Sequence, residues 1–318
     1  MQPKKSAVQH LVVDQEFSGQ RIDNFLIRHL KSIPKTRVYR ILRCGEVRVN
    51  KKRIAPSYRL QEKDDIRLPP LYLGKEAKHI PPSAETCVLL ENRILYEDES
   101  LMIINKPPGM SVHGGSTVRV GVIDALRASF PQYPHLELVH RLDSDTSGCL
   151  MIAKKRSMLR ELHALLREGK ISKIYLALTK GQWKPEECRV DAPLQKYHLK
   201  SGRRLVKISA EGKSALTVFK PLHVFQSSSL VEVYLYTGRT HQIRVHAQYL
   251  GHPVAGDERY GDSGFNKLLR QRGLKRLFLH AQSLDFIVPS NGKHIHVEAA
   301  LDEELDKVLY SLKALNGD

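Results

Sequence analysis

The chain has 318 residues and 41% of them are hydrophobic, which excludes global disorder and fits a main domain with a smaller accessory one. Its 51 Lys and Arg against 34 Asp and Glu give a formal net charge of +17, which points to a polyanionic partner. The surplus is concentrated in residues 1–79, which hold 18 basic and 8 acidic side chains, so this quarter is the better candidate for binding a phosphate backbone. The open alternative is a basic surface without a specific ligand.

The cysteines and the apolar runs limit the type of protein further. Cys44, Cys87, Cys149 and Cys188 form no CxxC pair, so neither a zinc ribbon nor a disulfide framework is suggested. The lysines near the start precede no apolar segment of the signal-peptide kind, and no apolar run approaches the roughly 20 residues of a membrane span. We therefore expect a soluble protein of the reducing cytoplasm.

Two short helices are expected within residues 20–44. One face of the first helix carries the apolar residues Ile22, Phe25, Leu26 and Leu30. The second starts near Pro34, ends at Gly45, and turns three apolar residues inward: Val38, Ile41 and Leu42. These two helices would form the start of a compact unit of about 50 residues.

The other face of the second helix carries a basic stripe, formed by Arg37, Arg40 and Arg43 at every third position. A strand is expected at residues 46–50, with Lys51 and Lys52 in the turn that follows and Arg53 at the start of the return strand. A lone stripe is usually a solvated helix face. The adjacent basic hairpin favours a nucleic-acid surface instead.

A linker is expected at residues 69–93, because its two Pro-Pro pairs favour extended, unpaired backbone. Beyond it, the pattern predicts strands at 101–105, 149–153, 174–179, 216–225, 230–236, 276–280 and 294–298. It predicts helices at 122–130, 157–169, 240–250 and from Asp302 onward. Hairpins mixed with helices favour an α+β fold on a mainly antiparallel mixed sheet. A doubly wound parallel sheet is disfavoured, since no Gly-rich strand-to-helix turn is found.

Two polar segments could carry chemistry. Residues 138–148, LVHRLDSDTSG, lie between two strand-like runs, where a loop often holds catalytic groups. The alternative is a turn whose Asp and Ser side chains bond their own backbone. Residues 237–246, TGRTHQIRVH, open a helix. A metal site is not expected there, because His241 and His246 are five residues apart, whereas ligation from one helix face needs three or four.

The first of these segments resembles the HRLDxxTSG motif of pseudouridine synthases of the ribosomal-large-subunit branch. Four further elements resemble that family's motifs and follow its order: NKPPG at 105–109, KIYLA at 173–177, GRTHQIR at 238–244 and GHP at 251–253. The resemblance spans about residues 94–300. It implies the pseudouridine synthase fold, with helices flanking the mixed sheet, for a catalytic domain at residues 94–318.

The amino-terminal part is similar to the S4 RNA-binding domain that often precedes this catalytic domain. The similarity rests on Arg21-Ile22-Asp23, Ser32, Gly45-Glu46-Val47 and Val49-Asn50. We therefore expect a small α+β domain at residues 1–80, with a core at about 19–68 and a Pro-rich linker to about 93.

The resemblance implies an isomerase that cleaves the C1′–N1 bond of a uridine, turns the base and rejoins it through C5. It assigns the catalytic carboxylate to Asp143, which would either add covalently to the substrate or act as a general base. Arg244 would pair with Asp143 and favour its charged form, and Tyr175 would stack on the uracil and handle the C5 proton. Arg141 would fill the stack that the flipped base leaves.

The other candidate substrate or RNA contacts are His140 and Thr146, which would shape the loop, Ile243 as a pocket wall, Arg239, and the basic residues Arg37, Arg40, Arg43, Lys51, Lys52 and Arg53. The resemblance implies no metal and no cofactor, a monomer, and large-subunit (23S) ribosomal RNA as substrate, with transfer RNA as the alternative. Two other classes stay open: an S4-type RNA-binding protein without catalysis, and a hydrolytic nucleosidase or glycosidase that would use Asp145 as its acid.

Overall fold

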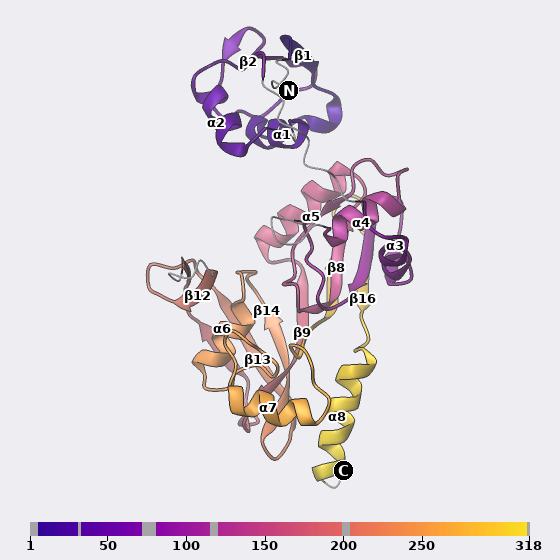
Figure 1. The fold of residues 1–318 in the computed structure, drawn as a ribbon, viewed down its shortest axis with the longest axis vertical. Helices are drawn as coiled ribbons and strands as arrows, with labels where there is room; N and C mark the ends of the chain where they lie inside the picture. Colours follow the sequence, from indigo (N-terminus) through magenta and orange to yellow (C-terminus); the bar gives the residue numbers. More distant parts are fainter. Residues whose placement is uncertain (1–5, 31–32, 72–80, 115–119, 199–203, 317–318) are drawn as a thin grey trace, which may run out of the picture. The chain divides into compact units, whose positions relative to one another are not determined.

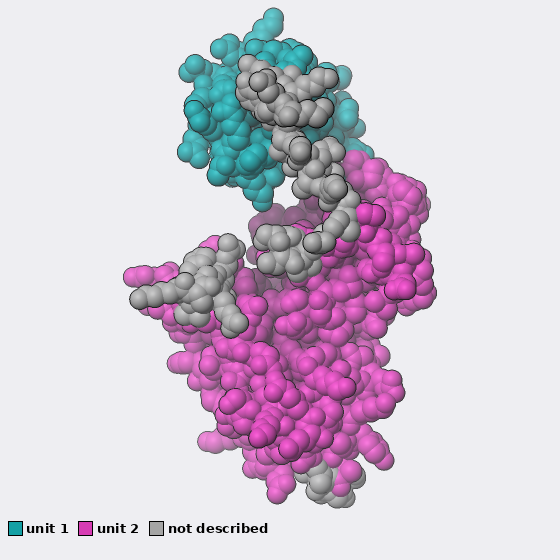
Figure 2. Space-filling view, in the orientation of Figure 1, with its two compact units in different colours: residues 1–80 teal, residues 81–318 magenta. Residues whose placement is uncertain are grey.

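The structure is a computed structural model that forms two compact units, residues 1–80 and 81–318 (Figures 1 and 2). It describes residues 6–30, 33–71, 81–114, 120–198 and 204–316. Each unit has its own hydrophobic core. Among the described residues, no helix is both long and apolar enough to cross a membrane.

The first unit is a four-stranded antiparallel sheet with two helices. The strand order is β1 (Gln9–Val12), β4 (Asp65–Leu68), β2 (Arg48–Val49) and β3 (Lys52–Arg53). A 3-10 turn (Gln15–Phe17) and the helices α1 (Ile22–His29) and α2 (Lys35–Arg43) complete it. All seven apolar side chains predicted to face inward from the two helices are buried, so the predicted periodicity is confirmed.

The basic hairpin of this unit turns one residue earlier than predicted. Asn50 and Lys51, with φ of 49° and 68°, form the turn, and Lys52 already belongs to strand β3. Two consecutive left-handed residues match the twist of a two-residue hairpin, and Asn tolerates that conformation better than Lys does. The sequence interpretation followed the run of charge and missed the conformational preference of Asn50.

The predicted linker at 69–93 is wrong in its second half. Residues 72–80 lie outside the described residues, but α3 (Ala84–Glu91) is a helix whose cap Ser83 accepts a hydrogen bond from the Thr86 N–H at 3.2 Å. Leu90 is fully buried where α3 packs against α4 (Val122–Ser129). The Pro-Pro pair before Ser83 precedes a helix start and does not continue a linker.

The second unit is built on a ten-stranded sheet. In spatial order its path is β10 (Cys188–Asp191), β13 (Leu216–Val224), β14 (Ser228–Leu235), β9 (Ser172–Lys180), β15 (Leu279–Ile287), β8 (Ser147–Ala153), β6 (Leu101–Lys106) and β5 (Ile94–Glu97), with β16 (His294–Glu298) on β15 and β7 (Glu137–Leu138) on β8. Every pairing in this sheet is antiparallel except β15 with β8. A separate hairpin pairs β11 (Leu194–His198) with β12 (Arg204–Ile208). The predicted α+β class with a mainly antiparallel mixed sheet is confirmed.

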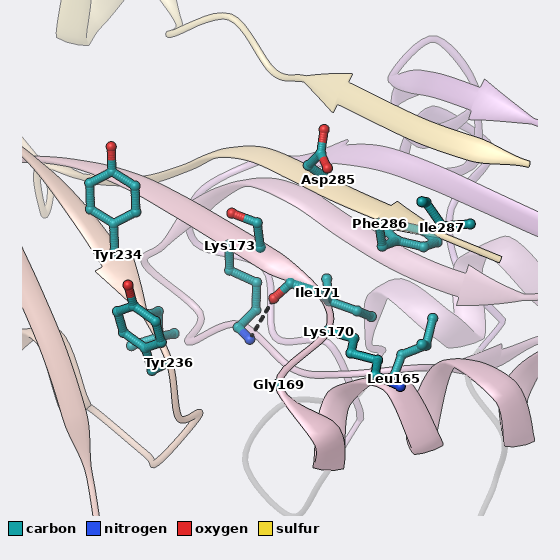
Figure 3. A pocket seen from close by; sticks show the side chains of 12 residues that line it. Leu165, Gly169, Lys170, Ile171, Lys173, Tyr234, Tyr236, Asp285, Phe286 and Ile287 are labelled. Atoms are coloured by element: carbon teal, nitrogen blue, oxygen red, sulfur yellow. Dashed lines mark hydrogen bonds between the residues drawn. The ribbon is translucent and has the colours of Figure 1, made fainter. Parts of the chain in front are cut away.

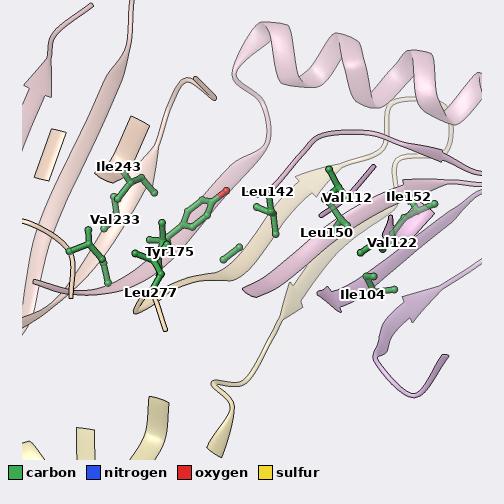
Figure 4. Packing of buried hydrophobic residues seen from close by; sticks show 14 of the residues in the cluster. Ile104, Val112, Val122, Leu142, Leu150, Ile152, Tyr175, Val233, Ile243 and Leu277 are labelled. Carbon is green, nitrogen blue, oxygen red and sulfur yellow. The ribbon is translucent and has the colours of Figure 1, made fainter. Parts of the chain in front are cut away.

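Helices cover the β6–β8 region of the sheet on both faces. Alternate residues of β6 and β8, such as Ile103 and Met151, pack against α5 (Arg156–Glu168), while Ile104 and Leu150 pack on the side of α4. Burial on both faces explains why these strands are continuous apolar runs. The α4-side cluster extends as far as Tyr175 (Figure 4).

Three further helices follow β14: α6 (Gln242–Tyr249), α7 (Ser263–Gln271) and α8 (Glu303–Asn316). Asp302 accepts a hydrogen bond from the Leu305 N–H at 3.1 Å, as predicted for a cap. The strand predicted at 276–280 begins only at Leu279 and runs to Ile287. Its polar residues Gln282 and Asp285 hid its length, and α7 was not predicted.

The parallel pairing of β15 and β8 depends on Gly148. This residue has φ of +108°, and a Cβ built on it would lie 2.2 Å from the Ala281 carbonyl oxygen on β15. Only glycine fits both restrictions. Because Gly148 is the second residue of β8, directly after the 139–146 loop and Ser147, it fixes where that loop joins the sheet.

We expect Gly148→Ala to lower the melting temperature of the second unit by about 10 °C, since strain and a backbone clash together cost about 3 kcal/mol or more. Gly169→Ala is the control, because Gly169 is also left-handed at φ 69° but its Cβ would meet nothing within 4 Å. Fluorescence of Trp183, the single tryptophan of the chain, reports on this unit. Equal shifts for the two variants would contradict the packing argument.

Candidate active site

The 138–148 segment forms a tight loop between β7 and β8 that presents Asp143 at a pocket. The Thr146 N–H donates to the Asp143 carbonyl oxygen at 3.2 Å, and Thr146 itself is buried. The Asp143 side chain is 20% exposed. The carboxylate is therefore held at the pocket surface by local backbone turns and strand ends on both sides.

A buried lysine secures the same loop from below. Lys106, at the end of β6, is fully buried, and its ammonium donates to the carbonyl oxygens of Pro107, Met110 and Ser144 at 2.7 to 2.9 Å. Burial lowers the pKa of Lys106 to about 7, and the nearby charges of Asp145 and Asp143 oppose that shift. Three acceptors require three N–H donors, which only the ammonium form has. Lys106 thus ties the NKPPG turn to the loop that carries Asp143.

Arg244, on α6, reaches Asp143 across the pocket. Its Nη1 lies 3.3 Å from Asp143 Oδ2, so the predicted pairing is present. Its stronger partner is Asp257, whose carboxylate accepts from Nε and Nη2 at 2.7 Å each. Burial opposes the charge of Arg244, but Asp257 and then Asp143 outweigh burial and raise its pKa. The guanidinium is therefore oriented by Asp257 and only touches Asp143.

The charge of Arg244 does not depend on Asp143 alone. Arg244 keeps a bidentate buried partner when Asp143 is lost, so it is not left stranded. Asp143 Oδ1 accepts no hydrogen bond from any residue that the structure describes. The carboxylate thus keeps one oxygen available for a substrate.

His241 approaches the same oxygen of Asp143 as Arg244 does, from the N-terminus of α6. It caps α6 with φ of 55°, its Nδ1 hydrogen-bonds the Tyr260 hydroxyl at 2.8 Å, and its Nε2 lies 3.8 Å from Asp143 Oδ2. Burial lowers the pKa of His241, although the charge of Asp143 opposes this, so the ring is neutral near pH 7. The Tyr260 ring also lies under the Arg244 guanidinium at 5.2 Å.

Tyr175 projects from β9 into the same pocket. It is 6% exposed, and burial raises the pKa of its hydroxyl, with a smaller contribution from the charge of Asp143. The hydroxyl makes no hydrogen bond to any described residue. Ile243 is 4% exposed and forms a wall next to Tyr175 (Figure 4). The pocket thus pairs an apolar wall with a protonated phenol.

The predicted substrate contacts divide between buried and exposed positions. His140 accepts a hydrogen bond from the Met151 N–H at 3.1 Å, and burial, aided by the charge of Lys173, lowers its pKa to about 4. Arg141 and Arg239 are exposed, and the Arg239 Nε–H donates to the Ser214 carbonyl oxygen at 3.0 Å. His140 therefore has a structural position, whereas Arg141 and Arg239 face solvent.

Most of the predicted site residues of the second unit line one cavity of about 90 Å³: Asp143, Arg244, Tyr175, Ile243, Arg141, Thr146 and Arg239. His140 lines an adjoining hollow. The predicted basic contacts of the first unit are exposed, except Arg37, which is half-buried and lies 3.5 Å from Glu46. The described residues contain no group of three or more side chains that could hold a metal ion.

Sequence reasoning missed Asp257 and gave no role to Lys106 or to His241. Asp257 follows the GHP element and belongs to no motif that was recognised, so no signal pointed to it. Lys106 belongs to the recognised NKPPG element, but its burial became visible only in the structure.

Asp257→Asn is expected to reduce the free energy of unfolding by about 3–5 kcal/mol at pH 7, because it removes one member of a buried ion pair. Interaction with Arg244 outweighs burial and lowers the pKa of Asp257. Its stabilisation is therefore present above an unfolded-state value of about 3.9 and is lost as the pH falls through the folded-state value. The difference between wild type and variant should shrink on acidification.

Urea unfolding followed by Trp183 fluorescence from pH 7 to pH 3 measures this difference. Glu258→Gln is the matched control, because its exposed neighbouring carboxylate should contribute about 0.5 kcal/mol or less. A gap that stays constant down to pH 3 would show that the charge of Asp257 is not its source.

The comparisons with known proteins agree with this geometry. Residues 100–249 match the RNA pseudouridylate synthase family, and residues 20–66 match the S4 domain family. The chain is 50% identical over 309 residues to ribosomal large subunit pseudouridine synthase C of Pasteurella multocida (strain Pm70), covering 96% of this chain and 94% of that protein. It is 49% identical over 316 residues to the protein of that name from Escherichia coli (strain K12), covering 98% and 99%.

A solved structure has the same fold. Human RNA pseudouridylate synthase domain containing 4 superposes with a TM-score of 0.59 and 28% identity, over 72% of this chain and 97% of that chain. The full-length relatives at about 50% identity and the matching family model both indicate the same family. The chain belongs to the RNA pseudouridylate synthase family and carries an S4 domain before its catalytic region.

Proposed function

We propose that this protein converts selected uridines of large-subunit (23S) ribosomal RNA to pseudouridine, with Asp143 as the catalytic carboxylate. The observation that carries the proposal is the free Oδ1 of Asp143 in a pocket shared with Arg244 and Tyr175. The names of the relatives specify the ribosomal large subunit, and the S4 domain supports an RNA substrate. Transfer RNA is the second candidate. We place the activity in the cytoplasm, in a monomer.

The reaction breaks the C1′–N1 bond and forms a C1′–C5 bond, so no atom is added except by exchange of a proton. Asp143 Oδ1 has two possible tasks: to bond covalently to the substrate, or to stabilise the electron-poor sugar and remove a proton. The contact with Arg244 at 3.3 Å stabilises the carboxylate in both cases. Arg244 would be a positioning residue here, because Asp257 holds it in place.

Tyr175 would contact the uracil ring. With its pKa raised by burial and by Asp143, the hydroxyl stays protonated near neutral pH. It would therefore stack on the base and donate a hydrogen bond, and it would receive the C5 proton only if another group took its own. Ile243 would close the pocket on the detached base, and exposed Arg141 would enter the RNA stack that the flipped base leaves.

Asp143→Asn tests the catalytic assignment. Purified protein is incubated with large-subunit ribosomal RNA that carries tritium at C5 of uridine, and released tritium is counted. Wild type should release tritium, and the variant should be slower by at least about 10⁴-fold, because an amide neither adds to the sugar nor accepts the proton. Its melting temperature should match that of wild type, since Arg244 keeps Asp257.

The products separate the alternatives in the same reaction. Free uracil would indicate a hydrolase. Release of tritium from transfer RNA but not from ribosomal RNA would identify transfer RNA as the substrate. Absence of tritium release and of free uracil on both RNAs would leave an RNA-binding protein without catalysis.

Deleting residues 1–79 should weaken ribosomal RNA binding and flatten its salt dependence, because each lost phosphate contact reduces the slope of log K against log salt by about 0.7–0.9. Filter binding at several salt concentrations measures the slope. A full-length variant with Arg40, Arg43, Lys51 and Lys52 changed to Gln should show most of the same reduction. An unchanged slope in both proteins would remove the support for RNA binding by the first unit.

A further inference from the structure

A groove leads away from the catalytic pocket along the second unit. A hollow of about 610 Å³ shares Arg141, Tyr175 and Arg239 with that pocket. It also shares Lys173 and Tyr236 with a cavity of about 470 Å³, which Figure 3 shows. Because each hollow shares lining residues with the next, the 470 Å³ cavity adjoins the 610 Å³ hollow, which in turn adjoins the pocket of Asp143.

Tyr236 exposes its ring on the wall of this groove. It lies just beyond the end of β14 and is 56% exposed; Tyr249 and Tyr310 of this unit are also exposed but line neither hollow. Two residues earlier, Tyr234 donates its hydroxyl to Glu232 at 2.5 Å, whereas Tyr236 has no hydrogen bond or ring contact with a described residue. An exposed ring in a groove is what single-stranded nucleic acid binders offer to a base.

Lys173 lies opposite Tyr236 in the groove and lacks partners for its charge. It is 8% exposed, and its ammonium donates only to the Ile171 carbonyl oxygen, at 3.3 Å (Figure 3). No carboxylate of the described residues lies within 4.0 Å of it. An ammonium has three donors, and a buried charge without a counter-charge is costly. An anion in the groove would supply what Lys173 lacks.

The charge of the groove suits a phosphate. The ionisable side chains that line the two hollows, apart from His140 and tyrosines, are the basic Arg141, Arg167, Lys170, Lys173 and Arg239 and the acidic Glu168 and Asp285. Both carboxylates already have cationic or histidine partners: Glu168 lies 2.8 Å from Lys170, and Asp285 contacts His294 and His296. The uncompensated charge is therefore positive.

Strand geometry fixes the spacing between this site and the catalytic pocket. Lys173 and Tyr175 are alternate residues of β9, so they lie on one face and about 7 Å apart along the strand. The spacing between Lys173 and Tyr175 is comparable to the distance between neighbouring nucleotides in an extended RNA strand. We propose that the groove binds the nucleotide adjacent to the target uridine, with its phosphate at Lys173 and its base against the Tyr236 ring. This inference rests on the proposed function.

The test uses the full-length protein and a short transcript around a uridine that the protein modifies. Single-turnover tritium release at increasing protein concentration yields a half-saturating concentration and a maximal rate. Tyr236→Ala should raise the half-saturating concentration about ten-fold or more, the loss typical of one stacked base, and leave the maximal rate within about two-fold. Tyr236→Phe keeps the ring and should behave as wild type. Tyr310→Ala removes an exposed tyrosine of α8 that lines neither hollow and should change nothing.

Removing the base from the RNA locates the contact. A transcript with an abasic residue on one side of the target should bind wild type about ten-fold more weakly and should cause no further loss with Tyr236→Ala. Lys173→Met should reduce the salt slope of binding by about 0.7, and Lys173→Arg should restore it. Each of these results supports the subsite.

Other results overturn it. If wild type is active and Tyr236→Ala has the same half-saturating concentration as Tyr310→Ala, the groove does not bind a base. A fall in maximal rate without a change in half-saturation would also exclude the subsite, because it would place Tyr236 in catalysis or folding. If wild type releases no tritium, the proposed function fails first and the subsite falls with it.

Discussion

The buried pair of Arg244 and Asp257 is the constraint on which the catalytic pocket depends. A guanidinium in the interior requires a counter-charge, and the bidentate contact at 2.7 Å provides it in a fixed plane. Because that pair is complete without Asp143, the carboxylate that we propose as catalytic contributes little to holding the site together. Its free oxygen can then contact a substrate without destabilising the fold. The group proposed to react is thus distinct from the groups that hold the site in place.

Two other devices bring Asp143 to this pair. Lys106 binds three carbonyl oxygens, one of them in the Asp143 loop, and Gly148 lets β8 approach β15 where the loop ends. Both act on the backbone: Lys106 binds the loop next to Asp143, at the Ser144 carbonyl oxygen, and Gly148 lies just after the loop, at the start of β8. A catalytic loop built in this way is rigid, as a reaction that must hold a detached base requires.

The recognisable parts of the site were those with local motifs. The family resemblance pointed to the Asp143 loop and to the segment with Arg244, whereas the apolar faces of α1 and α2 could be predicted from short-range spacing alone. Asp257 could not, since its role exists only when a residue 13 positions away points at it. The helix α3 was hidden by neighbouring prolines, and the length of β15 by polar residues that face a partner strand. These errors share one cause: contacts between residues distant in the sequence determine the structure at each of these places.

Charge and geometry also divide the work of binding between the two units. The first unit carries most of the surplus positive charge on short exposed elements, and such contacts give affinity without reading a base. The second unit carries a smaller surplus, but its groove combines an under-partnered ammonium, Lys173, with an exposed ring, Tyr236. Lys173 is two residues from Tyr175 on β9, so the proposed contacts would hold the neighbouring nucleotide close to the uridine pocket, whereas stacking on Tyr236 would not itself select a base.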